Sequence, residues 1–171
     1  MARVKKDAGS AALRRKKPTE LLLLHSGIME ELRRRGIVRS ANNPTGDLAE
    51  YIFCKAYGWN REGNSKAGFD ASCKRTKRKY QIKARRVTSR NKSRQLSAIR
   101  ELDACHFDFL AGIIFNERYE VAKAIIVPHK AIRGRCTYVE HTNSHKLLLH
   151  DDVWKLPGAK DVTKKLRAVR L

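Results

Sequence analysis

Two nearly continuous apolar runs stand out in the chain, at residues 107–115 and 121–127. Such runs are typical of strands that are covered on both faces, because no position in them has to meet water. Pro128 follows the second run directly and ends it, since proline lacks the N–H group that a strand ladder needs. We therefore predict two buried strands, followed by a short helix at residues 129–132.

An alternating pattern precedes these runs. In a strand, Gln81 and Lys83 face one side of the sheet, whereas Tyr80 and Ile82 face the other. Residues 74–79 are polar and basic, as in a turn, and Asp70 lies just before them. An antiparallel pairing across this turn brings Asp70 close to Gln81. The spacing predicts a β-hairpin that gathers a carboxylate, an amide and an ammonium group on one face.

Helical spacing precedes the hairpin. Residues 18–35 begin with proline, repeat apolar side chains near helical intervals and stop at Gly36. Residues 47–57 follow Thr45, a favourable N-cap, and stop before Gly58. We predict a helix in each segment.

The remaining segments give weaker patterns. They predict a helix at residues 94–105, strands at 138–140 and 146–149, and a last helix from Asp161 to residue 168. The order of helix, hairpin, strand, connection and strand indicates a mixed α/β sheet rather than an all-helical protein.

The charge of the chain indicates the kind of partner that it binds. The 38 Lys and Arg residues against 17 Asp and Glu give a formal net charge of +21, which favours a polyanion such as nucleic acid. No acidic residue lies between Asp70 and Glu101. A basic run is often only a solvated surface, but this one encloses the predicted hairpin, which favours phosphate contacts. The predicted nucleic-acid contacts are Lys74, Arg75, Lys77, Arg78, Arg85, Arg86, Arg90 and Arg94.

Length and composition bound the organisation. We expect a flexible basic arm at residues 1–17, because nothing there builds a core, and a single domain over 18–171. The four cysteines are far apart with no Cys-x-x-Cys pair, which argues against a zinc ribbon or a disulfide framework. No apolar run approaches the roughly 20 residues of a membrane span. We expect a cytoplasmic protein.

Asp70, Gln81 and Lys83 form the candidate catalytic group. A carboxylate and an amide oxygen are hard ligands suited to Mg²⁺, and an ammonium beside them stabilises charge that develops on a phosphate. Each residue also has a plainer interpretation: a strand-end Asp with local hydrogen bonds, a Gln in a cross-strand hydrogen bond, and a solvated Lys.

The arrangement resembles the PD-(D/E)xK nuclease superfamily over roughly residues 45–128, on Asp70, on Gln81-x-Lys83, and on Glu50 in the preceding helix. Gln81 departs from the usual acidic residue. The resemblance implies a restriction-endonuclease-like fold, a mixed sheet of about four or five strands flanked by helices. It also implies metal ligation by Asp70, Gln81 and Glu50, with Mg²⁺ or its substitute Mn²⁺, and a catalytic role for Lys83. The implied function is a metal-dependent endonuclease of restriction or repair type that hydrolyses duplex DNA, and the implied assembly is a homodimer, as in many nucleases of this type.

Two alternatives stay open. The first alternative is a non-catalytic, basic nucleic-acid-binding protein on a degenerate nuclease fold, in which Gln81 reflects a loss of metal affinity. His141, His145 and His150 offer a different metal centre, because a four-residue separation on a helix would suit zinc. The turn-like residues 142–144 between the first two argue against that helix.

Overall fold

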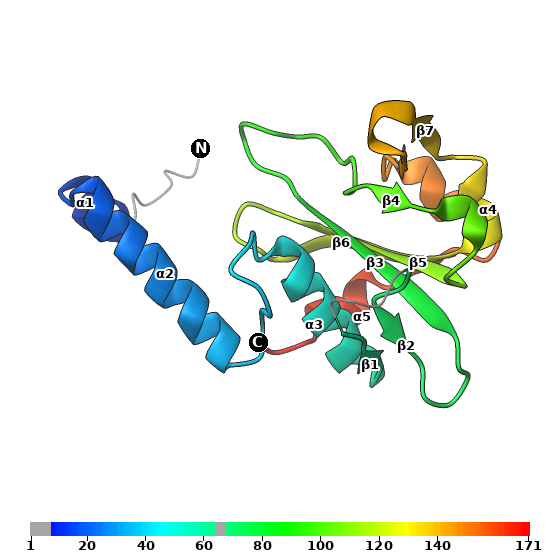
Figure 1. Cartoon of the computed structure of the whole chain (residues 1–171), viewed down its shortest axis with the longest axis horizontal. Helices are drawn as coiled ribbons and strands as arrows, with labels where there is room; N and C mark the ends of the chain where they lie inside the picture. The colour runs from blue at the N-terminus through cyan, green and yellow to red at the C-terminus, as the bar shows by residue number, and fades with distance from the viewer. Residues whose placement is uncertain (1–7, 64–67) are drawn as a thin grey trace. The chain divides into compact units, whose positions relative to one another are not determined.

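The computed structural model describes residues 8–63 and 68–171, and the chain divides into two compact units (Figure 1). The first unit ends at Asn42 and contains α1 (Ala8–Arg14) and α2 (Pro18–Arg34). The second unit spans residues 43–171.

This division falls between residues 42 and 43, whereas the sequence predicts a boundary between residues 17 and 18. Part of the expected arm is the helix α1, while residues 1–7 lie outside the described part. The helix predicted at residues 18–35 is confirmed as α2, but it belongs to the first unit. Its own local contacts stabilise it, since Glu31 pairs with Arg34 at 2.8 Å and with Arg35 at 2.7 Å, which are i,i+3 and i,i+4 spacings. Such a helix can form without joining the core of the second unit.

The second unit is built on a six-stranded mixed sheet, which confirms the predicted α/β class. Only the β3–β5 pairing is parallel among the pairings of the described strands. Two-residue strands at the edges, too short to show alternation in the sequence, raise the count above the expected four or five. In spatial order the strands are β1 (Asn60–Arg61), β2 (Ala71–Ser72), β3 (Lys79–Arg86), β5 (Phe109–Phe115), β6 (Val121–Pro128) and β9 (Lys160–Asp161).

A smaller sheet and short helices complete the unit. The small sheet has the order β4 (Ile99–Arg100), β8 (Ser144–Lys146) and β7 (Thr137–Val139). The helices are α3 (Thr45–Tyr57), α4 (His129–Arg133) and α5 (Thr163–Arg167), with 3-10 turns at Leu102–Ala104, Glu140–Thr142 and Asp151–Lys155.

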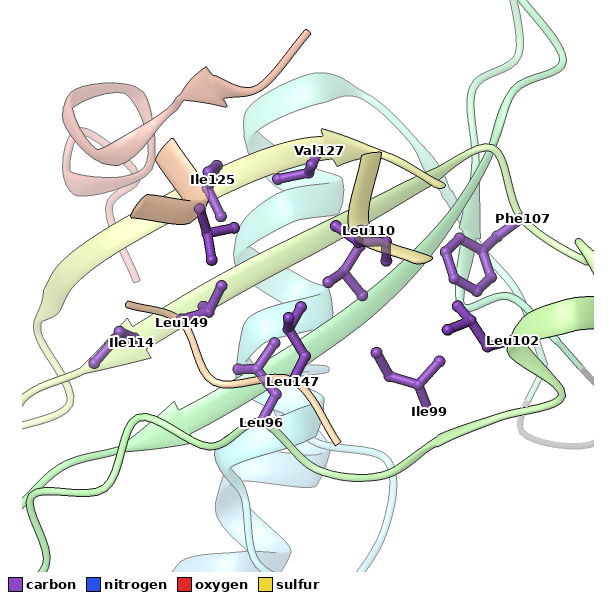
Figure 2. Close-up of a cluster of buried hydrophobic side chains, with 12 residues drawn as sticks. Leu96, Ile99, Leu102, Phe107, Leu110, Ile114, Ile125, Val127, Leu147 and Leu149 are labelled. Carbon is purple, nitrogen blue, oxygen red and sulfur yellow. The ribbon is translucent and has the colours of Figure 1, made fainter. Parts of the chain in front are cut away.

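The two faces of the main sheet have different covers. Helix α3 packs on the face that carries Tyr80 and Ile82, and it ends at Gly58, whose left-handed φ of 64° suits glycine. On the other face, Leu110 and Val127 belong to a buried cluster with side chains from residues 96–102 and 147–149. Figure 2 looks onto this cluster, with α3 passing behind the strands. Tyr80 and Gln81 on β3 therefore point into different layers.

The helix predicted at residues 94–105 is wrong. Leu96, Ile99 and Leu102 recur at helical intervals and all three are buried, yet Leu96 and Ile99 lie in extended backbone and Leu102 begins a short 3-10 turn. The Leu96 N–H donates to the Leu147 carbonyl at 2.9 Å, and Ile99 pairs with His145 in the small sheet. Tertiary pairing with a distant segment determines the conformation here, against the local pattern.

Within residues 8–63 and 68–171, none of the helices is both long enough and apolar enough to cross a membrane.

Candidate active site

The predicted hairpin is confirmed. Strand β2 pairs antiparallel with β3, with Ala71 opposite Tyr80, and the turn between them closes through the Cys73 N–H, which donates to the Arg78 carbonyl at 2.9 Å. Asp70 lies one residue before β2, and its N–H donates to the Tyr80 carbonyl at 2.9 Å. This register brings Asp70 beside Gln81.

The Asp70 carboxylate is tied to β3 through a single oxygen. Oδ2 accepts a hydrogen bond from the Gln81 side-chain amide at 2.6 Å and another from the Ile82 backbone N–H at 2.6 Å. Gln81 is buried, and Asp70 is half-buried. Because one oxygen accepts both bonds, the other carboxylate oxygen keeps its lone pairs for further contacts.

Lys83 completes the group on the same face. Gln81 and Lys83 together line a pocket of about 500 Å³, as expected for side chains two residues apart on a strand. We call this pocket the cleft. Its opposite wall comes from the segment at residues 97–101. The structure thus places Asp70 beside Gln81, and Gln81 and Lys83 share one side of the cleft.

Two charged residues of the cleft were not among the predicted site residues. Arg100 and Glu101 line it opposite Lys83. Glu101 has a φ of 49°, which costs energy for any residue with a side chain, and its carboxylate lies 3.1 Å from His106 Nε2. Because residues 94–105 were predicted to form a helix, Arg100 and Glu101 were not expected to line a pocket beside β3. The available signal was that Glu101 is the first acidic residue after the long basic stretch.

Glu50 lies in a different group. It is on α3, a helix as predicted, and its carboxylate accepts a hydrogen bond from Arg61 Nε at 2.9 Å. Arg61 pairs with Ala71 and so faces the α3 side of the sheet, whereas Asp70, the preceding residue, faces the cleft. The Arg61 guanidinium also binds Asp47 at 3.0 Å, and these side chains are largely shielded from solvent. The structure does not place Glu50 with Asp70 and Gln81.

The predicted nucleic-acid contacts fall into separate regions. Lys74, Arg75, Lys77 and Arg78 are exposed on the β2–β3 turn, and Arg90 is exposed in the following loop.

Three further predicted contacts have protein partners. Arg85 donates to the Ser93 carbonyl at 3.2 Å, Arg86 donates to the Glu117 carbonyl at 2.6 Å, and Arg94 pairs with Asp151 at 2.7 Å. Of the two neighbouring arginines on β3, Arg85 is on the same side of the strand as Lys83.

The histidine alternative finds no support in the geometry. His145 is on strand β8 rather than a helix, and its Nε2 lies 3.8 Å from Asp103. Across the described residues, no three His, Cys, Asp or Glu side chains are placed to hold a metal ion together. That statement also covers the contact between Asp70 and Gln81, which joins one carboxylate and one amide.

No protein-family model matches this sequence, and no curated protein is significantly similar to it.

Proposed function

We propose that this protein is a Mg²⁺-dependent nuclease of the PD-(D/E)xK type that hydrolyses phosphodiester bonds in DNA. The observation that carries the proposal is the 2.6 Å contact between Asp70, just before β2, and Gln81 on β3, with Lys83 beside Gln81 on the wall of the cleft. A carboxylate, an amide and an ammonium group that converge from β-strands beside an electropositive surface suit phosphodiester hydrolysis better than other hydrolytic chemistry.

The donor set fits a hard cation with few protein ligands. Mg²⁺ commonly takes one or two carboxylates and completes its shell with water and substrate phosphate oxygens. Asp70 supplies the charged ligand, and its second oxygen is available because Oδ2 accepts both hydrogen bonds. Gln81 would supply the neutral ligand through its amide oxygen, since its amide nitrogen donates the hydrogen bond to Asp70. When bound, the cation would polarise the phosphodiester and lower the pKa of a coordinated water.

The protein's own groups position the substrate. Lys83 and Arg100 line the cleft from opposite walls, so their charges converge on a phosphate placed between them. Lys83 then stabilises the negative charge that develops on the phosphoryl oxygens during attack. Half-buried Asp70, fixed by its two hydrogen bonds, holds its free oxygen in one direction.

Duplex DNA is the proposed partner because of charge. The formal net charge is +21, and the exposed turn of the hairpin carries four of the cations. Binding should release counterions and weaken steeply as salt rises.

One observation favours the alternative of a non-catalytic nucleic-acid-binding protein. Glu50, the second acidic residue of the resemblance, is bound to Arg61, so of the two acidic residues of the resemblance only Asp70 contacts Gln81. A neutral second ligand lowers metal affinity, so a chain with this site could retain binding without cleavage.

A nicking assay separates the two functions. Supercoiled plasmid is incubated with the full chain and Mg²⁺ or Mn²⁺, with EDTA as the negative control. We expect metal-dependent nicks that Lys83→Gln abolishes and that Gln81→Glu maintains or increases, because Glu restores a second negative ligand. Lys92→Gln is the matched control, since it removes the same charge from an exposed loop position. If wild type and Gln81→Glu both bind DNA but leave it intact with either metal, the binding function replaces the nuclease.

A further inference from the structure

A second pocket, of about 450 Å³, lies on the face of the sheet opposite the cleft. Tyr80 lines this pocket, whereas Gln81, the next residue, lines the cleft. Successive side chains of a strand point to opposite faces, so β3 separates the two pockets. The remaining walls come from the end of α3, the β2–β3 turn, and β5, β6 and β9. We call it the aromatic pocket.

A stack of four aromatic rings forms one wall. Ring centroids are 4.8 Å apart for Tyr57 and Trp59, 3.7 Å for Trp59 and Tyr80, and 5.5 Å for Tyr80 and Phe109, all at interplanar angles of 23° or less. At the ends of the stack, Lys165 lies 3.8 Å from the Tyr57 centroid and Arg78 lies 5.3 Å from that of Phe109. The stack therefore presents ring edges to the pocket, and these edges carry partial positive charge.

Cations surround the same space. Lys74, Arg75, Arg78 and Lys160 line the aromatic pocket, and the lining contains no Asp or Glu among the described residues. Within the described segments, none of these four forms an ion pair with an acidic side chain. Uncompensated cations on a concave surface favour an anionic ligand.

The phenol groups contribute donors. Burial is the main cause that raises the pKa of Tyr57 and of Tyr80; Tyr80 adds to the shift of Tyr57, and Cys73 and Asp108 add to that of Tyr80, so both hydroxyls keep their protons at neutral pH. A protonated phenol donates hydrogen bonds to acceptors such as phosphate oxygens. Ile126 adds an apolar surface at the same pocket, suited to a sugar or a base.

We propose that the aromatic pocket binds one nucleotide unit through its phosphate, on the face of the sheet opposite the nuclease cleft. The volume lies within the range of small-ligand sites, and the combination of four cations with aromatic edges suits a phosphate attached to a flat apolar group. The choice of a nucleotide over other phosphate compounds rests on the proposed function. Strand β3 then supports two sites, one for chemistry and one that holds a strand end, a backbone segment or a free nucleotide.

The test uses Trp59 as the reporter. Fluorescence of the full chain carrying Trp154→Phe is titrated in EDTA, so that no cleavage occurs, with thymidine monophosphate, with inorganic phosphate, and with a short oligothymidylate bearing or lacking a 5′-phosphate. We expect a saturable change with the nucleotide. Tighter binding of the 5′-phosphorylated strand would assign the pocket to a strand end, and equal binding of both strands would assign it to the backbone. Binding of thymidine monophosphate as tight as that of the oligothymidylates would assign the pocket to free nucleotides.

The pocket variant is Arg75→Gln combined with Lys160→Gln, which removes cations contributed by two different elements. It should weaken nucleotide binding by about tenfold or more, because charged hydrogen bonds are strong. The matched control is Lys92→Gln combined with Lys155→Gln, which removes the same two charges from exposed positions outside the pocket lining. This control should change the affinity by less than about twofold.

Different results would reject the nucleotide pocket and the nuclease function. Unchanged binding in the double variant, with normal circular dichroism, overturns the pocket even if the wild type cleaves DNA. Inorganic phosphate that competes as well as thymidine monophosphate overturns the nucleotide assignment. A wild type that never cleaves, yet loses nucleotide binding only in the double variant, overturns the nuclease and supports the pocket.

Discussion

Replacing Asp70 by two different residues separates its structural role from its chemical role. In Asp70→Ala, the buried Gln81 amide and the Ile82 N–H both lose the oxygen that they share. In Asp70→Asn, the amide oxygen can take the position of Oδ2 and accept both hydrogen bonds, while the negative charge is lost. Both variants should fail to cleave DNA, but only the alanine variant should be markedly less stable.

The expected magnitude follows from the two bonds. A hydrogen bond to a charged group contributes roughly 1.5 to 3 kcal/mol, and the cost of partly desolvating the carboxylate offsets some of that gain. We expect Asp70→Ala to lower the free energy of unfolding by about 2 to 3 kcal/mol. For a unit of this size that is a fall in Tm of roughly 6 to 12 °C. Asp70→Asn should cost less than about 1 kcal/mol, because it keeps both bonds without the charge.

Urea unfolding followed by circular dichroism measures these differences, and the plasmid assay measures cleavage. Asp151→Ala is the matched control, since its carboxylate is 67% exposed and the same charge is removed from the surface. An alanine variant as stable as the wild type would refute the structural role of the hydrogen bonds. Equal destabilisation by Asn and Ala would show that the charge, rather than the shared acceptor, stabilises the hairpin.

Three further predictions concern packing, charge and thiol chemistry. Gly112→Ala should cost about 1 to 3 kcal/mol in urea unfolding, because the added Cβ would lie 2.9 Å from a leucine methyl carbon, and unchanged stability would contradict that close approach. Arg85→Gln, on the cleft side of β3, should reduce the slope of log K against log salt for duplex DNA by about 0.9. Equal slopes for this variant and for Arg86→Gln, on the other side of the strand, would contradict the placement of DNA on the cleft side. Alkylation followed by mass spectrometry should modify Cys73 at lower pH than Cys136, because hydrogen bonds from the turn lower the pKa of the Cys73 thiol, whereas burial raises that of Cys136 to about 11; the reverse order would refute this.

The hairpin could be predicted from the sequence because its information is local. Alternation in the strand and a short basic turn determine which side chains share a face, and the contact between Asp70 and Gln81 follows from the register. The two buried strands were equally clear, since β5 and β6 are continuous apolar runs with a proline at the end.

The far wall of the cleft could not be predicted, because distant pairing determines it. Residues 94–105 show helical spacing, and only the pairing of Leu96 with Leu147 and of Ile99 with His145 makes the segment extended. Arg100 and Glu101 reach the cleft for that reason alone.

The ion pair between Glu50 and Arg61 could not be predicted from the sequence either. Glu50 fits the position of a helical acidic ligand, and nothing near it in the chain shows that Arg61, eleven residues later, binds its carboxylate. The stack that joins Trp59 to Tyr80 and Phe109 likewise depends on three separate elements meeting at one end of the sheet.

The origin of the far wall has a consequence for protein synthesis. The segment that lines the cleft opposite Lys83 is held by strand and backbone pairings to residues 144–149, about fifty positions later in the chain. A nascent chain that has released the hairpin and β5 still lacks the partner of Leu96, so one face of its sheet stays uncovered. During this interval the basic hairpin is already exposed, before the cleft exists. Folding of the hairpin and assembly of the cleft are therefore separate events in time, and a chain that stops short of residue 144 would carry the hairpin without the complete cleft.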